Sequence, residues 1–195
     1  MTLRTTTIRP KICKVCKCKF QPRISLATVC GVPCAQSLAV SIRAKAAKVA
    51  AVQDKRETKA KLDALRKKPQ LVVLAQKAFN SFIRARDAGK PCICCGKPLT
   101  AGAIGGGYDA GHYRSVGSAP NLRFDETNCH AQSKHCNQYL AGNHVAYRQG
   151  LIKRIGLRMV ELIEADQTVR RYTHEGLVEI ARYYNAEARR LKVAI

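Results

Sequence analysis

Apolar residues recur at helical spacing over much of the chain. From Leu71 to Ala88 they stand every three or four positions, and Gly89 follows where a helix is expected to end. Similar periods run from Val145 to Val193 and predict two or three further helices, which we expect to pack on the rest of the protein. The pattern therefore predicts a mostly helical chain.

The segment between residues 35 and 68 is rich in Ala and Lys, contains no Gly, and lies between Pro33 and Pro69. These features predict one long helix. Its apolar positions are too few for a deep core, so we expect an exposed basic arm. A solvated spacer helix is the alternative, because runs of charge often have no specific partner. Contacts with DNA phosphates are expected from Lys45, Lys48, Lys55, Arg56 and Lys59.

A different pattern occupies the middle of the chain. Residues from Tyr108 to Arg114 have strand-like character, and a second short strand is expected from Asn121 to Phe124. A polar loop follows, and a helix is expected to begin near Cys136. Two strands followed by a helix form a ββα unit. The predicted fold class is therefore α+β, mostly helical, with a small ββα core.

These patterns divide the chain into four expected segments. A small N-terminal unit covers residues 1–34, and the basic helical arm covers 35–69. The ββα core with its preceding helix covers 70–145, and a C-terminal helical segment covers 146–195.

The charge of the chain points to a polyanionic partner. Its 35 Lys and Arg residues stand against 13 Asp and Glu, which gives a formal net charge of +22. Such an excess favours nucleic acid as the partner. The chain contains no run of about 18 apolar residues, the length that a membrane-spanning helix needs. No signal-peptide pattern opens the chain either. We therefore expect a cytoplasmic protein that has no membrane partner.

Ten cysteines fall into two clusters, which in a cytoplasmic protein favours metal binding over disulfides. In the first cluster, two pairs of thiols have the spacing of a closed tetrahedral zinc site. A redox or disulfide cluster is the alternative. Cys18 is surplus to the site. The expected ligands are Cys13, Cys16, Cys30 and Cys34.

The second cluster surrounds residues suited to phosphodiester hydrolysis. Cys92 and Cys95 form a Cys-x-x-Cys pair, and Cys136 is expected to complete the same structural zinc site. His112 stands between them at the expected end of a strand, where a neutral imidazole can act as general base. A buried, hydrogen-bonded histidine is the alternative interpretation.

Two oxygen-bearing side chains complete this prediction. Asp109 and Asn137 offer the ligands that Mg²⁺ or Mn²⁺ prefers. We expect them to hold a catalytic cation in the same pocket as His112. Asn121 is expected to orient the histidine through hydrogen bonds. Candidate phosphate contacts near this pocket are Arg84, Arg114 and Arg123.

At these residues the chain resembles the HNH endonucleases, especially the branch that includes phage endonuclease VII. The resemblance is closer to the NinG family of lambdoid phages, also called Rap. It covers most of the chain. The matching stretches are Cys13–Cys16, Ala75–Asp87, Asp109–Tyr113, Asn121–Asn128, Cys136–Asn137 and Gly142–Asn143.

The resemblance implies a ββα-metal core in a structure-selective endonuclease. Such an enzyme acts on branched recombination intermediates such as Holliday junctions and D-loops. It also implies a homodimer, a divalent cation, and a phage protein that works in the cytoplasm of its bacterial host.

The chain departs from the endonuclease VII pattern at two places. Gly111 stands where that pattern has a metal-ligating acid, so Asp109 is a substitute candidate and Asp125 another. Ser133 stands where the second Cys-x-x-Cys requires its first cysteine. Cys129 is the preferred fourth zinc ligand, with His130 as the alternative.

Two further functions remain open at the level of sequence. A non-catalytic, zinc-containing DNA-binding or annealing factor would keep the ββα shape as a scaffold. An RNA-directed nuclease is the other, because phosphate contacts alone carry no sugar preference.

Overall fold

The computed structural model describes residues 8–100 and 107–193. The chain forms two compact units, Met1–Ala64 and Leu65–Ile195. The expected N-terminal unit and most of the basic arm lie in the first. The expected ββα core and the C-terminal helices lie together in the second. The mostly helical α+β class is confirmed, with two small sheets among the helices.

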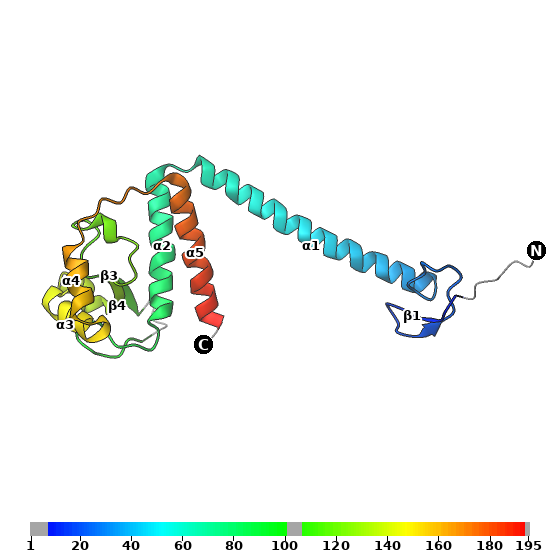
Figure 1. Cartoon of the computed structure of the whole chain (residues 1–195), viewed down its shortest axis with the longest axis horizontal. Coiled ribbons are helices and arrows are strands. Elements are labelled where there is room, and N and C mark those ends of the chain that lie inside the picture. Colours follow the sequence, from blue (N-terminus) through cyan, green and yellow to red (C-terminus); the bar gives the residue numbers. More distant parts are fainter. Residues whose placement is uncertain (1–7, 101–106, 194–195) are drawn as a thin grey trace, which may run out of the picture. The chain divides into compact units, whose positions relative to one another are not determined.

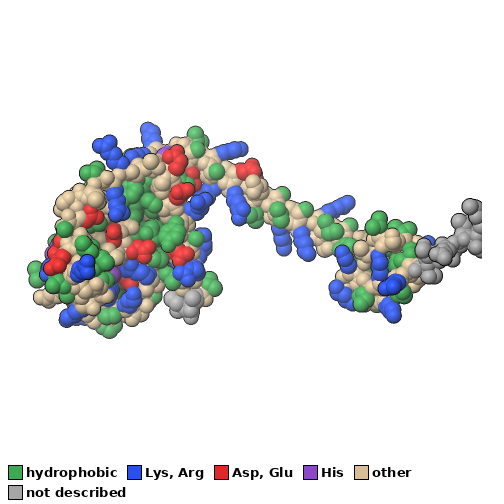
Figure 2. Space-filling view, in the orientation of Figure 1, with side chains coloured by type: hydrophobic (Ala, Val, Ile, Leu, Met, Phe, Trp, Pro, Cys, Tyr) green, Lys and Arg blue, Asp and Glu red, His purple; other side chains and the backbone are tan. Residues whose placement is uncertain are grey.

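The first unit contains a hairpin and a long helix. Strands β1 (Lys11–Ile12) and β2 (Lys19–Phe20) pair antiparallel. Helix α1 (Val32–Leu65) has 34 residues and is therefore about 51 Å long. Nearly all of its side chains are exposed, and Figure 2 shows Lys and Arg side chains along it.

Two helices from distant parts of the chain lie side by side in the second unit (Figure 1). Helix α2 (Lys68–Arg86) begins with Pro near its N-terminus, where a missing N–H costs nothing. It packs along α5 (His174–Val193). The rings of Phe79 and Tyr184 meet edge to face at 4.9 Å between centroids. Aromatic packing of this kind joins the two helices.

A second hairpin packs against α2. Strands β3 (Tyr108–His112) and β4 (Cys129–Ser133) are antiparallel, with His112 opposite Cys129 and Tyr108 opposite Ser133. The prediction of a strand over 121–124 was wrong. That stretch begins in a 3₁₀ turn, η1 (Pro120–Leu122), because Pro120 has no N–H to donate to a strand ladder.

The hairpin loop is tied together by one buried asparagine. Asn128 accepts a hydrogen bond from the Arg114 N–H at 2.8 Å. Its amide donates to the Arg114 carbonyl at 3.0 Å and to the Leu122 carbonyl at 3.3 Å. These bonds satisfy backbone groups where the strand ladder ends.

Helical segments follow the hairpin. A single π-helical turn, η2 (His135–Tyr139), stands where a helix was expected to begin. Helices α3 (His144–Ile155) and α4 (Leu157–Ala165) come next. With α5 they account for the expected C-terminal helices. The core beneath them contains Tyr147, Leu151, Val160 and Ile163.

A buried ion pair at the end of α2 fixes the hairpin in place. Asp87 is fully buried, and its carboxylate accepts the Ala131 N–H at 3.0 Å. Arg86 donates to the same carboxylate and to the Cys129 carbonyl, each at 2.8 Å. Burial disfavours the charged carboxylate, but the hydrogen bonds from His130 and Arg86 prevail and hold the pKa of Asp87 far below its usual range. The start of β4 is therefore attached to α2.

Within the described ranges, no helix is both long and apolar enough to cross a bilayer.

Candidate functional site

The first cysteine group has the geometry of a closed metal site. The sulfur atoms of its four cysteines lie within 4.8 Å of one another. Cys13 follows β1 directly and is fully buried, whereas Cys34 lies in the first turn of α1. The surplus Cys18 stays outside the group, and its thiol lies 3.7 Å from the Cys16 carbonyl. The four predicted ligands are thus brought together and can hold a structural zinc ion.

A second group joins the segment before β3 to the turn after β4. The sulfur atoms of Cys92, Cys95 and Cys136 lie within 4.8 Å of one another. The Ser133 N–H donates to the Cys92 sulfur at 3.3 Å. Hydrogen bonds from the Cys94 thiol and from this N–H outweigh burial and lower the pKa of Cys92 to about 3. A thiolate of this kind suits zinc.

Cys129, the predicted fourth ligand, is not in this group. It lies at the start of β4, four residues from Ser133, and therefore about 13 Å along the strand from the zinc end. Its thiol lies 3.8 Å from Nδ1 of His112. Burial raises the pKa of this thiol, so it is uncharged. The alternative ligand, His130, is also absent from the group, because its ring nitrogens contact Arg86 and the Thr127 carbonyl.

Both ring nitrogens of His112 have partners, and its Nδ1 lies 3.8 Å from the Cys129 thiol. Its Nε2 lies 2.9 Å from the carbonyl oxygen of Arg123, which can only accept, so Nε2 carries the hydrogen. Nδ1 then carries the lone pair. Burial lowers the pKa of His112 below its ordinary value of 6.5. The ring is therefore neutral at pH 7 and can accept a proton at Nδ1.

Asp109 and Asn137 are close to each other but not to His112. The amides of Asn137 and Gln138 both donate to Oδ2 of Asp109 at 2.8 Å. Side chains along a strand alternate between its two faces, and Asp109 stands three positions before His112. The Asp109 side chain therefore projects from the face of the hairpin opposite to His112. The expectation of one pocket for the base and the cation needs correction.

The donor set around Asp109 does not fit a catalytic cation beside His112. It contributes one carboxylate, whose Oδ2 accepts two amide N–H groups. One carboxylate oxygen of Asp125, the other candidate acid, is occupied as well. Its Oδ1 accepts the N–H groups of Thr127 at 2.8 Å and of Asn128 at 3.2 Å, which makes it a turn residue.

Asn121 does not orient the histidine. Its side-chain amide lies 3.4 Å from the Asp166 carbonyl, and its own carbonyl is 3.4 Å from the Tyr172 hydroxyl. The orienting group is the backbone carbonyl of Arg123, which no side-chain pattern in the sequence indicates.

The basic residues predicted to contact phosphate differ in whether their side chains are bonded within the protein. Arg114 is committed to the protein, because its Nη1 donates to the carbonyls of Ile163 at 3.0 Å and Asp166 at 2.7 Å. This arginine caps the end of α4, a role that disfavours the expected contact with DNA. Arg84 and Arg123 line a pocket instead. The five basic residues expected to contact phosphate on α1 are exposed.

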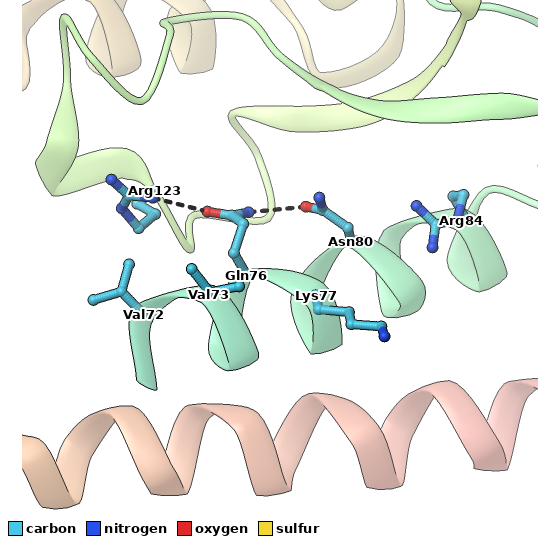
Figure 3. Close-up of a pocket in the computed structure, with 7 residues that line it drawn as sticks. All are labelled: Val72, Val73, Gln76, Lys77, Asn80, Arg84 and Arg123. Atoms are coloured by element: carbon cyan, nitrogen blue, oxygen red, sulfur yellow. Dashed lines mark hydrogen bonds between the residues drawn. The ribbon is translucent and has the colours of Figure 1, made fainter. Parts of the chain in front are cut away.

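The pocket lies on α2 beside the segment that orients His112. Its volume is about 360 Å³. Figure 3 shows six lining residues along α2 and Arg123 reaching toward them from the segment after η1. Sequence reasoning missed Gln76, Lys77 and Asn80. Their spacing of one and four residues along a predicted amphipathic helix was the available signal.

Comparisons with known proteins identify the family. The family model described as bacteriophage lambda NinG protein matches residues 6–193. The chain is 38% identical over 191 residues to the protein ninG of Escherichia phage 933W, covering 92% of each protein. It is 43% identical over 129 residues to that of Salmonella phage P22, covering 66% of this chain and 61% of the relative. It is 42% identical to that of Escherichia phage lambda, with the same coverage. No solved structure matches significantly. The chain therefore belongs to the NinG family of bacteriophage proteins.

Proposed function

We propose that this protein is a structure-selective DNA endonuclease that hydrolyses phosphodiester bonds in branched recombination intermediates. The observation that carries the proposal is the state of His112. It is a neutral imidazole whose Nε2–H is held by the Arg123 carbonyl, which leaves Nδ1 as proton acceptor. The same Arg123 contributes its side chain to a basic pocket.

This arrangement matches the needs of phosphodiester hydrolysis. The general base takes a proton from the attacking water, and nearby positive groups stabilise charge on the phosphate. Nδ1 of His112 serves as the base. The guanidinium group of Arg123, whose charge helps to lower the pKa of His112, is the nearby positive group, and Arg84 lines the same pocket. An HNH-like ββα core, implied by the order of hairpin and helix and by the motifs around His112, is part of the same proposal.

Selection of branched DNA, a homodimer, and dependence on Mg²⁺ or Mn²⁺ are proposed from the resemblance to HNH enzymes and the NinG family. Two equal active sites related by a twofold axis would suit paired cuts across a junction. The two cysteine groups can hold structural zinc ions. In the second unit, zinc would staple the start of the hairpin to the turn that follows it.

A second candidate function is a zinc-containing DNA-binding factor without catalysis. Two observations favour it. The Asp109 and Asn137 side chains lie on the face of the hairpin opposite to His112. The uncharged Cys129 thiol stands 3.8 Å from Nδ1, on the side from which a water molecule would be activated. Such a factor would bind a junction with a steep salt dependence and yield no cleaved product.

Cleavage of an end-labelled four-way junction, with Mg²⁺ or Mn²⁺ added in turn, separates the two functions. The endonuclease predicts discrete products from the wild-type protein and none above background from His112→Ala, with junction binding unchanged. His135→Ala is the matched control, because His135 is exposed. Equal cutting by His112→Ala would remove His112 from the mechanism. Absence of product from wild type with either ion would favour the binding factor. An RNA junction of the same sequence tests sugar preference.

A further inference from the structure

The pocket on α2 presents hydrogen-bond donors almost exclusively. Arg123 donates from Nη1 to Oε1 of Gln76 at 3.3 Å, and Gln76 donates from Nε2 to Oδ1 of Asn80 at 2.8 Å. The side-chain oxygens of Gln76 and Asn80 therefore each accept a hydrogen bond within the pocket. Within the described part of the chain, the amide nitrogen of Asn80 has no acceptor and is left as the free end (Figure 3).

Three cations line the same pocket without an acidic partner. Lys77, Arg84 and Arg123 belong to the lining, which contains no Asp or Glu. Among the described residues, none of the three has a carboxylate within 4.0 Å. Elsewhere in this unit several basic side chains are paired, as Arg148 is with Glu164 at 2.7 Å. A ligand for this pocket must therefore supply negative charge and acceptor oxygens.

The shape of the pocket favours an extended polyanion over a single small anion. Its lining runs from Val72 to Arg84 along α2, which is about 18 Å at the rise of an α-helix. Successive phosphates of one DNA strand are separated by about 3.4 Å along a duplex axis. Several consecutive phosphates therefore fit along the lining, and the carboxamide between the cations adds a neutral donor. The two valines, Val72 and Val73, form an apolar wall that can face sugars.

We propose that the α2 pocket, lined by Gln76, Lys77, Asn80, Arg84 and Arg123, binds the backbone phosphates of one DNA strand. The strand is held without reference to its sequence, because phosphate contacts position DNA and do not specify bases. Arg123 connects this function to His112, since its side chain lines the pocket and its carbonyl accepts from the imidazole. The inference rests on the proposed function only in taking DNA as the ligand.

The test measures how affinity for a fluorescein-labelled oligothymidylate depends on salt, by anisotropy with the full-length zinc-loaded protein and no added Mg²⁺. Each lost phosphate contact on a single strand lowers the slope of log K against log salt by about 0.7. Lys77→Gln and Arg84→Gln should each lower it by that amount between about 50 and 200 mM salt and weaken binding about tenfold. Lys77 is exposed and makes no ion pair, so its removal leaves the fold intact.

Matched controls come from Lys153 and Arg158, which are exposed on α3 and α4. Lys153→Gln and Arg158→Gln should leave the slope at the wild-type value. Asn80→Asp places a carboxylate among the donors and should weaken binding more than Asn80→Ala does. The inference is overturned if Lys77→Gln and Arg84→Gln, folded by circular dichroism, keep the slope of the two controls.

This outcome is separate from that of the cleavage assay. Wild-type cutting of a junction with unchanged slopes in the pocket variants would leave the proposed endonuclease standing and remove the α2 pocket. Lowered slopes without any cutting would establish the pocket in a protein that only binds DNA.

Discussion

Nε2 of His112 donates a 2.9 Å hydrogen bond to the carbonyl oxygen of Arg123, whose side chain lines the basic pocket on α2. One residue of the loop thus sets the tautomer of the candidate base and contributes charge to the candidate DNA site. The segment after η1 therefore contributes to both candidate sites through Arg123, although it forms no strand.

Acid should destabilise the protein through two histidines, the half-buried His112 and the buried His130. Burial lowers the pKa of both His112 and His130 below 6.5 in the folded state. Both groups therefore stabilise the fold above the unfolded pKa, and this stabilisation is lost as the pH falls through the folded pKa. The unfolding free energy, from urea titrations between about pH 5 and 7.5, should level off above about pH 6.5 and fall below it.

The contribution of one histidine can be separated by substitution. His112→Gln should reduce the acid slope by up to about 1.4 kcal/mol per pH unit. The exposed His135 provides the comparison, and His135→Gln should leave the slope unchanged. An acid slope that is identical in all three proteins would show that His112 is not buried in neutral form. The charged and titratable groups that face His112 are Arg123 and the Cys129 thiol.

Gly111 cannot be replaced by a side chain at low cost. A Cβ built there would lie 1.9 Å from Oε1 of Gln132, which is fully buried. Gly111→Ala should therefore destabilise the protein by about 1–3 kcal/mol in urea unfolding. Gly117→Ala is the control, because its Cβ would meet only a serine hydroxyl at 3.9 Å. Combining Gly111→Ala with Gln132→Ala should recover part of the loss, and strict additivity would contradict the proposed clash.

Arg114 should matter for stability and not for DNA binding. Its guanidinium donates to the last carbonyls of α4, including those of Ile163 and Asp166. Arg114→Ala leaves these acceptors without their partner and should cost about 2 kcal/mol in unfolding free energy. Arg158→Ala, on the exposed side of α4, should cost little. A large loss of DNA affinity in folded Arg114→Ala would restore the sequence-based expectation that it contacts phosphate.

Each cysteine group should account for one zinc ion. Cys34→Ser and Cys136→Ser each remove one thiolate from a different group, so each variant should lose one equivalent of zinc by elemental analysis. Cys136→Ser should also lower the thermal stability of the second unit. Cys18→Ser is the control and should retain full zinc, since Cys18 stands outside the first group. Full zinc in Cys136→Ser would contradict a metal site at the second group.

The sequence predicted those features that depend on local spacing. The Cys-x-x-Cys pairs, the long helix without Gly, and the histidine at a strand end all follow from neighbouring residues, and the structure contains them. The position of the second strand could not be read in this way, because it depends on Asn128 tying the loop to Arg114. The residue type of Cys129 predicted a zinc ligand, but at its position in β4 the thiol lies beside Nδ1 of His112.

The separation of Asp109 from His112 was already present in the sequence. A spacing of three residues on a strand places two side chains on opposite faces. In the endonuclease VII pattern the metal-ligating acid directly precedes the histidine, whereas in this chain Gly111 takes that place. The α2 pocket was missed for another reason. Its donors come from a helix and from a loop 47 residues later in the chain, and no local pattern links Gln76 to Arg123.

The central claim is that His112 is the general base of a nuclease, and single-turnover cleavage of a pre-bound four-way junction tests it most directly. With Mg²⁺ or Mn²⁺ added, the wild-type protein should cut, and His112→Ala should bind equally but cut about 10²–10⁴ times more slowly. Cutting by His112→Ala at the wild-type rate would contradict the claim.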